Sequence, residues 1–138
     1  MPSIEKALCD TGPLVAIADR EDAAHLKCRE AFGRFGGNLV TTWPVLTEAF
    51  HFLDAPLLRD FLWEFILCSG IEIGDLSMGE LSRMRLLMTQ YASLPMDFAD
   101  ASLVVLAERL RVRFVFTLDR RDFLLYRPRH IGTFDIFP

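Results

Sequence analysis

The sequence predicts a single α/β domain built around a largely parallel β-sheet. Short apolar runs of strand length alternate with longer segments whose apolar residues recur at helical spacing, and this alternation is typical of parallel sheets. The 138 residues suffice for one hydrophobic core, and 51% of them are apolar. No internal repeat, low-complexity tract or linker divides the chain. We therefore expect one domain over residues 1–138.

The expected strands and helices are placed by apolar periodicity and by capping residues. The strands are residues 4–9, 38–41, 71–73, 114–117 and 134–136. The helices are residues 14–18, 22–35, 44–53, 56–68, 78–91 and 97–110. Thr42 is the expected N-cap of the helix with Pro44 in its first turn, and Ser77 has capping-box spacing to Glu80.

Composition and cysteine usage exclude several classes of protein. A net charge of −4 is not that of a general nucleic-acid binder. Cys9, Cys28 and Cys68 show no C-x-x-C spacing, which argues against a disulfide framework and a zinc site and favours a reducing compartment. The first six residues lack the apolar run of a secretory signal, and Glu64 interrupts the longest apolar stretch. We expect a cytoplasmic protein with no membrane-spanning segment.

The arginines are concentrated toward the C-terminal end. Seven of the thirteen lie between Arg109 and Arg129, whereas only three acidic residues follow Arg109. A local contact surface for phosphate groups would explain this distribution. Scattered, solvated side chains would explain it equally well, so the charge pattern alone leaves both interpretations open.

Two acidic residues follow predicted strands directly. Asp10 comes after strand 4–9, and Asp119 comes after the apolar run that begins at Phe114. Because ligands of parallel sheets bind beyond the carboxyl ends of the strands, both carboxylates are expected at the same edge. An Asp at a strand end often only starts a turn or caps a helix, so either residue alone is weak evidence.

Three further acids extend this set. Asp97 and Asp100 are three residues apart at the start of a helix, which places them on one face near the positive end of its dipole. Capping explains one of them more easily than two. The helix that follows is almost wholly apolar and must be buried, so its acids face a cleft. Glu48 alone would be a solvated side chain, and its functional interest depends on the other acids.

Carboxylates that converge in one place require compensation. They repel one another, so either a proton or a cation must be bound. Oxygen ligands without a Cys or His pattern suit Mg²⁺ or Mn²⁺ rather than zinc. Such an ion lowers the pKa of bound water and stabilises charge on a phosphodiester. The chemistry that this pattern indicates is metal-assisted hydrolysis.

These acids stand in motifs that resemble those of PIN-domain ribonucleases, specifically the VapC-type toxins of toxin–antitoxin pairs. The matching segments are Cys9-Asp10-Thr11, Glu48 in helix 44–53, Asp100-Ala101-Ser102-Leu103 with Leu106-Ala107-Glu108, and Thr117-Leu118-Asp119-Arg120-Arg121-Asp122-Phe123. Their order and spacing span nearly the whole chain. The four motifs in sequence are more specific than any one of them.

The resemblance implies a three-layer α/β/α sandwich with a central, mostly parallel sheet, and a site that binds Mg²⁺ or Mn²⁺. The residues that match the family's catalytic acids are Asp10, Glu48, Asp100 and Asp119. Asp97 joins these four as an expected metal ligand, whereas a role for Asp122 stays open. Thr11 and Thr117 match hydroxyl residues that orient carboxylates or water.

The resemblance also implies endonucleolytic cleavage of RNA, inhibition by a cognate antitoxin and a homodimer. In the expected mechanism the aspartates hold the metal, Glu48 binds or orients the attacking water, and the 3′ oxygen leaves, so that products carry 5′-phosphates. Arg120 and Arg121 are the expected contacts to the RNA backbone. Arg109, Arg111 and Arg113 are expected to widen this basic patch.

Other functions make different demands on the sequence. A receiver domain expects an acidic pair after the first strand, and a haloacid-dehalogenase-like phosphatase expects D-x-D, but Asp10 is followed by Thr11 and Gly12. A metal-free ribonuclease would need a histidine base, and the three histidines show no paired arrangement. The main alternative is a catalytically silent PIN-like module that binds a protein through the apolar segment 57–67. This segment equally suits an antitoxin groove, a homodimer face or the core.

Overall fold

The computed structural model describes residues 5–138 and contains a five-stranded sheet in which every neighbouring pair is parallel. The strands are β1 (Lys6–Cys9), β2 (Asn38–Thr42), β3 (Glu72–Gly74), β4 (Phe114–Phe116) and β5 (Asp135–Phe137). Their order across the sheet is β3-β2-β1-β4-β5. The expected parallel sheet is confirmed. Ile4, the expected first residue of strand 4–9, lies outside the described residues.

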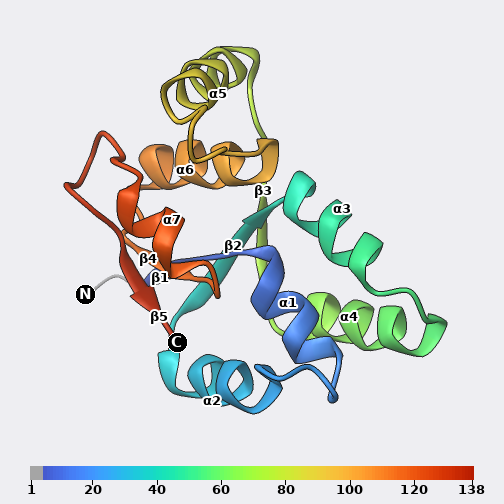
Figure 1. Ribbon diagram of the computed structural model, residues 1–138. Coiled ribbons are helices and arrows are strands. Elements are labelled where there is room, and N and C mark those ends of the chain that lie inside the picture. The colour runs from blue at the N-terminus through green and yellow to red at the C-terminus, as the bar shows by residue number, and fades with distance from the viewer. Residues whose placement is uncertain (1–4) are drawn as a thin grey trace.

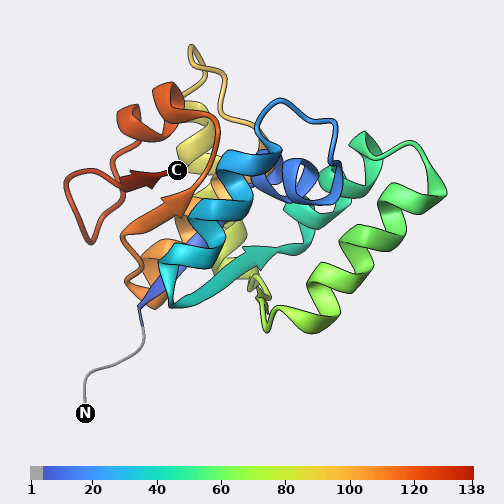
Figure 2. The same cartoon turned by 90° about the horizontal axis from the view of Figure 1, so that it is seen from below.

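Helices cover both faces of the sheet, which makes the three-layer sandwich. They are α1 (Thr11–Ala18), α2 (His25–Phe35), α3 (Trp43–Phe52), α4 (Pro56–Cys68), α5 (Met78–Gln90), α6 (Phe98–Leu110) and α7 (Arg120–Leu125). Figure 1 shows α5, α6 and α7 above the sheet and α1, α2 and α4 below it. Figure 2 shows the lower layer in front of the strands. Within residues 5–138, no helix has the length and apolar character needed to cross a bilayer.

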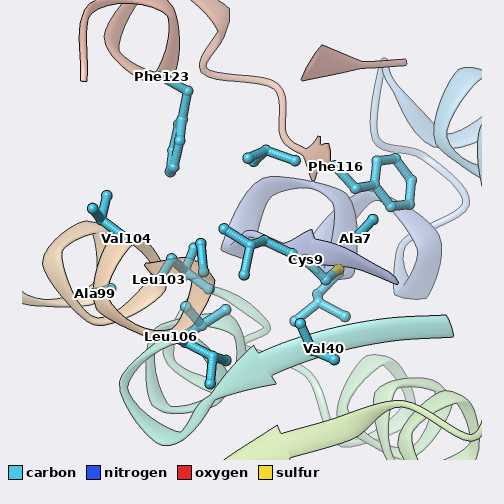
Figure 3. Close-up of a cluster of buried hydrophobic side chains, with 14 of the residues drawn as sticks. Ala7, Cys9, Val40, Ala99, Leu103, Val104, Leu106, Phe116 and Phe123 are labelled. Atoms are coloured by element: carbon cyan, nitrogen blue, oxygen red, sulfur yellow. The ribbon is translucent and has the colours of Figure 1, made fainter. Parts of the chain in front are cut away.

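The core lies on both faces of the central strands. Successive strand residues point to opposite faces, so β4 directs the Phe114 ring toward α2, where Phe35 packs edge-on against it at a centroid distance of 6.0 Å. On the other face α6 supplies Leu103 and Leu106, which Figure 3 shows in the cluster beside the strands. Residues 101–107 of α6 are all buried, as the apolar sequence of this helix predicts.

Three helices differ from the sequence-based expectation. Helix α1 begins at Thr11 rather than residue 14, because Asp10 caps it by accepting the Thr11 backbone N–H at 2.8 Å. Helix α2 begins at His25 rather than residue 22, because Asp22 Oδ1 accepts the Ala24 backbone N–H at 2.8 Å and holds a turn. Helix α7 was not predicted at all. Its six residues are too few to show helical periodicity, although Asp119-x-x-Asp122 repeats the N-terminal spacing of Asp97-x-x-Asp100.

The expected helix caps are met in different ways. Ser77 and Glu80 form the predicted capping box of α5. Thr42 holds the predicted N-cap position of α3, but its hydroxyl bonds the Ser102 hydroxyl of α6 at 2.7 Å instead of capping the helix. This contact joins α3 to α6 across the end of β2, and it fixes the relative position of two helices that carry predicted site residues.

The order of the strands defines where a ligand site forms. The chain leaves β1 toward α1 below the sheet and leaves β4 toward α7 above it, although these strands are neighbours (Figure 1). Such a switch in direction opens a crevice at the carboxyl ends of the two strands. Asp10 and Asp119 follow these two strands, so the topology brings together acids that are far apart in the sequence.

Candidate functional site

A pocket of about 480 Å³ at this sheet edge gathers all five acids that the sequence analysis named as metal ligands. These are Asp10, Glu48, Asp97, Asp100 and Asp119. Asp22, from the loop between α1 and α2, lines the same pocket and was not predicted. One wall is apolar and includes Val15, Phe52 and Leu118. The pocket therefore combines a dense negative charge with a small hydrophobic surface.

Asp10 is held by hydrogen bonds to both of its carboxylate oxygens. It is the N-cap of α1, where the Thr11 backbone N–H donates to Oδ1 at 2.8 Å. The Thr117 hydroxyl donates to Oδ2 at 2.7 Å and itself accepts the Asp119 backbone N–H at 2.9 Å. Thr117 thus connects the ends of β1 and β4. Both predicted orienting residues contact a site carboxylate, because the Thr11 hydroxyl donates to Glu48 Oε2 at 3.2 Å.

Glu48 reaches the pocket from the middle of α3. The position of this helix depends on buried polar contacts, because the Ser102 hydroxyl that meets Thr42 also donates to the Ala99 carbonyl at 2.6 Å. The Thr41 hydroxyl donates to the Cys9 carbonyl at 2.8 Å and ties β2 to β1 next to Asp10. These threonine and serine contacts were not predicted, because they join elements that are distant in the sequence.

Asp97 and Asp100 occupy the first turn of α6. Asp97 is the N-cap, and its Oδ1 accepts the Asp100 backbone N–H at 2.8 Å. Asp100 does not cap the helix through its side chain. Its Oδ2 accepts a hydrogen bond from the hydroxyl of Tyr126 at 2.7 Å, a contact that no sequence pattern predicted. Asp97 therefore caps the helix, while Asp100, three residues later, directs a second carboxylate at the pocket.

Asp100, Asp119 and Asp122 come closest to forming a ligand set among the described residues. Each offers one oxygen, and these oxygens all lie within 4.8 Å of one another. Asp122 is the residue whose role the sequence left open, and it enters the set because α7 turns it toward Asp119, which caps the helix by accepting the Asp122 N–H at 3.5 Å. Asp10, Glu48 and Asp97 line the pocket together with Asp100 and Asp119 but lie outside this trio, whereas Asp122 is not among the residues that line the pocket.

Burial and mutual repulsion make several of these acids hard to ionise. Burial, opposed by the Thr117 and Thr11 hydrogen bonds, raises the pKa of Asp10 to about 6. Burial and then the charges of Asp10 and Asp97 raise the pKa of Asp100 to about 8. Burial also raises the pKa of Glu48 and of Asp119. Burial, followed by the charge of Asp100, raises the pKa of the Tyr126 hydroxyl, so this group remains a donor.

The residues present fit a hard divalent cation. The donors around the pocket are carboxylate and hydroxyl oxygens, and no cysteine or histidine is among the described residues that line it. A cation would replace the protons that the raised pKa values of Asp10 and Asp100 indicate. Carboxylates that are costly to ionise without a partner are the groups that gain most from a bound metal ion.

The arginines are divided between the two ends of the molecule. Arg120 and Arg121 open α7 next to Asp119, and Arg120 donates to the Pro138 carbonyl at 3.2 Å. The expected widening of this patch by Arg109, Arg111 and Arg113 is wrong. Helix α6 begins at the pocket and is about 20 Å long, so the turn that follows it lies at the opposite sheet edge. There Arg109 pairs with Glu80 at 2.9 Å and Arg113 with Asp135 at 3.4 Å.

Asp100 should make the metal-free protein less stable as pH rises. Its folded-state pKa of about 8 lies above its ordinary value of 3.8, so the folded state keeps a proton that the unfolded chain releases. The stability is fully present below about pH 4 and is lost as pH rises toward 8, by up to about 1.4 kcal/mol per pH unit from this one group. We expect Asp100→Asn in EDTA to be more stable than the unaltered protein at pH 8, with a smaller difference at pH 5.

Urea unfolding of both proteins between pH 5 and 8 measures this effect. Asp60→Asn, which neutralises an exposed acid on α4, is the matched control and should leave the pH dependence unchanged. Identical pH slopes for Asp100→Asn and the unaltered protein would contradict the desolvation of Asp100.

Comparison with known proteins supports the family resemblance. No protein-family model matches the chain. The chain is 31% identical to Ribonuclease VapC26 of Mycobacterium tuberculosis (strain ATCC 25618 / H37Rv) over 142 residues, which cover 95% of this chain and 99% of that protein. Identity at this level over nearly the full length of both chains indicates common descent rather than a shared local motif.

Two solved structures share the fold. VapC20 of Mycobacterium tuberculosis, a toxin that cleaves the sarcin–ricin loop, matches with a TM-score of 0.74 at 13% identity, over 83% of this chain and 91% of that chain. VapBC2 of Rickettsia felis, bound to a DNA fragment from its promoter, matches with a TM-score of 0.65 at 14% identity, over 96% and 99%. The fold, the order of the acidic motifs and the identity to VapC26 agree, and the chain belongs to the VapC family of PIN-domain ribonucleases.

Proposed function

We propose that this chain is a divalent-metal-dependent endoribonuclease that acts as the toxin of a VapBC-type toxin–antitoxin pair in the cytoplasm. Family membership supports RNA cleavage, because VapC26 is a ribonuclease and VapC20 is a toxin that cleaves the sarcin–ricin loop. The observation that carries the proposal is the pocket in which the five predicted acids meet at the carboxyl ends of parallel strands. Burial and mutual repulsion make a cluster of this many acids costly, and a bound cation would offset that cost.

Asp100, Asp119 and Asp122 are the proposed core of the cation site, with Asp10 beside them. The first three can present oxygens within 4.8 Å of one another, and Asp10 is fixed by its bonds to Thr11 and Thr117. Asp97 adds negative charge from the N-cap of α6. A bound Mg²⁺ or Mn²⁺ would supply a more acidic water molecule and offset the charge that develops on the phosphodiester.

Glu48 is the proposed residue that orients the attacking water. Thr11 donates to its Oε2, and a carboxylate held in this way can accept a hydrogen bond from water and then a proton. In this scheme Glu48 takes its proton from water, so the ribose 2′-hydroxyl is not the nucleophile. The proposed products therefore carry 5′-phosphates and 3′-hydroxyls.

Loss of one carboxylate should abolish metal-dependent cleavage. We expect the unaltered protein to cut RNA with Mg²⁺ or Mn²⁺, to lose this activity in EDTA, and to leave 5′-phosphate ends. Asp10→Asn should lower the rate by more than the roughly 10- to 100-fold typical of residues that only support metal ligands. Asp60→Asn, on the exposed side of α4, serves as the control with unchanged activity.

The outcome also separates the rival functions. Chelator-resistant cleavage would favour a metal-free ribonuclease. Absence of cleavage by the unaltered protein, with and without metal, would favour the catalytically silent interaction module. Full activity of Asp10→Asn would exclude Asp10 from the catalytic site.

Arg121 is the better of the two expected RNA contacts to test. It is exposed in the first turn of α7 next to Asp119, whereas Arg120 already donates to the Pro138 carbonyl. The exposed Phe52 and Leu118 side chains offer apolar surface on which an unpaired base can rest beside the acids. The proposed substrate is therefore a single-stranded segment whose backbone passes over the start of α7.

Removal of the Arg121 charge should weaken RNA binding more at low salt than at high salt. We expect Arg121→Ala to raise KM several-fold with little change in kcat. The plot of log affinity against log salt concentration should become less steep by about 0.7, the value for one lost phosphate contact on a single strand. Arg111→Ala, an exposed arginine at the opposite sheet edge, is the matched control. Equal effects of both substitutions would show that only overall charge matters.

A groove between α1, α2 and α4 is the proposed docking site for the antitoxin. It measures about 650 Å³, and its apolar lining includes Phe32, Phe61 and Phe65. Arg20 and Arg29 also line it, which favours a partner segment that combines apolar anchors with acidic residues. The assembly of VapBC2 supports such a partner for a chain of this fold.

A charge in this groove should weaken antitoxin binding. Phe61 is 41% exposed and lines the groove, so Phe61→Lys should lower affinity for the cognate antitoxin, the expected product of the neighbouring open reading frame, by at least about tenfold. Trp63 lies on the same helix, is 52% exposed and packs against Phe50 outside the groove. Trp63→Lys is therefore the control. A loss of antitoxin affinity in Trp63→Lys but not in Phe61→Lys would place the docking site on the other face of α4.

A second copy of the chain is proposed to pack on α5 and α6. Met88 and Phe98 line a groove of about 690 Å³ there, and Arg85 is the one charged side chain among the residues that line it. Met78 and Leu86 are exposed nearby on α5. This largely uncharged surface suits a self-association, whereas the arginine-lined groove suits an acidic partner.

A further inference from the structure

Tyr126 is a buried aromatic residue behind the acidic pocket whose hydroxyl reaches the site. It follows the last turn of α7, and none of its surface is exposed. Its ring packs edge-on against Tyr91 at 5.1 Å and Phe123 at 5.2 Å between ring centroids. A ring held by packing on two sides gives its hydroxyl a fixed position, so the direction of its hydrogen bond is determined by the core.

The hydroxyl of Tyr126 contacts one oxygen of Asp100. It donates to Oδ2 at 2.7 Å, and this is the one hydrogen bond to the Asp100 side chain among the described residues. The other oxygen, Oδ1, is left without a protein donor. Since Asp100 belongs to the trio whose oxygens come within 4.8 Å, a bond that fixes one of its oxygens also fixes how the carboxylate faces Asp119 and Asp122.

The rest of the site shows why Asp100 needs such a contact. Asp10 accepts one hydrogen bond from a backbone N–H and one from the Thr117 hydroxyl. Asp97 and Asp119 each cap a helix, so a backbone N–H sets the orientation of each of these two carboxylates. Asp100 lies in the first turn of α6, where Asp97 accepts its backbone N–H, and among the described residues no backbone N–H donates to its carboxylate. Without Tyr126, its carboxylate would be free to rotate away from Asp119 and Asp122.

We propose that Tyr126 is a positioning residue that holds the Asp100 carboxylate in the orientation required to bind the catalytic cation. The inference rests on the proposed metal-dependent function. Loss of a hydrogen bond that supports a metal ligand typically lowers metal affinity by roughly 10- to 100-fold. Tyr126 does not contact the substrate in this scheme, and its effect passes through Asp100.

The test compares two tyrosines of the same aromatic layer. Tyr126→Phe keeps the ring and removes the bond to Asp100. Tyr91→Phe is the matched control, because Tyr91 is also buried and its hydroxyl accepts the Arg127 backbone N–H at 2.8 Å without touching an acid. Mn²⁺ binding to the metal-free proteins is measured by electron paramagnetic resonance, the stability of each variant is measured by urea unfolding, and cleavage is measured against Mn²⁺ concentration.

We expect Tyr126→Phe to bind Mn²⁺ roughly 10- to 100-fold more weakly and to need correspondingly more Mn²⁺ for half-maximal cleavage, with kcat largely restored at saturating metal. Tyr91→Phe should lose stability but keep the Mn²⁺ affinity of the unaltered protein. Unchanged affinity in Tyr126→Phe, or an equal loss in both variants, would overturn the positioning role while the metal-dependent function stands. Failure of the unaltered protein to bind Mn²⁺ would overturn the proposed function itself, and this inference with it.

Discussion

The structure depends on keeping several carboxylates close together against their mutual repulsion and against the cost of burying them. Left to themselves, acids such as Asp10 and Asp100 would move toward water or take up protons, and their raised pKa values reflect this tendency. They stay because each is attached to an element that cannot move without disrupting the core. Residues 101–107 of α6 are buried, so the N-terminal end of this helix is fixed at the pocket.

Helix capping and a functional site are usually regarded as competing explanations for an Asp at the start of a helix, and here they are the same feature. Asp10, Asp97 and Asp119 are the N-caps of α1, α6 and α7. Three helix N-termini therefore point their positive ends at one pocket, and each cap stabilises the negative charge of its carboxylate. The arrangement lowers the cost of clustering acids before any cation is bound.

The parts of the site that sequence analysis predicted are those that local order determines. Asp10 and Asp119 are placed by the ends of parallel strands, and Asp100 by helical spacing from Asp97, so short segments were sufficient. Tyr126, Ser102 and Asp22 were missed because their contacts depend on how the layers pack: Tyr126 meets Asp100 across 26 residues, and Ser102 meets Thr42 across 60. The wrong extension of the basic patch has the same origin, since sequence proximity to Arg120 says nothing about which sheet edge Arg109 occupies.

The distribution of charge assigns two roles to the proposed cation. The chain carries a net charge of −4, and the pocket concentrates acids where a polyanionic substrate would have to approach. Repulsion of this kind opposes RNA binding as strongly as it opposes ionisation of Asp100. Arg120 and Arg121 flank the acids rather than neutralise them. A divalent cation at the trio would relieve both repulsions at once, so that binding of the RNA backbone and activation of water would depend on the same ion.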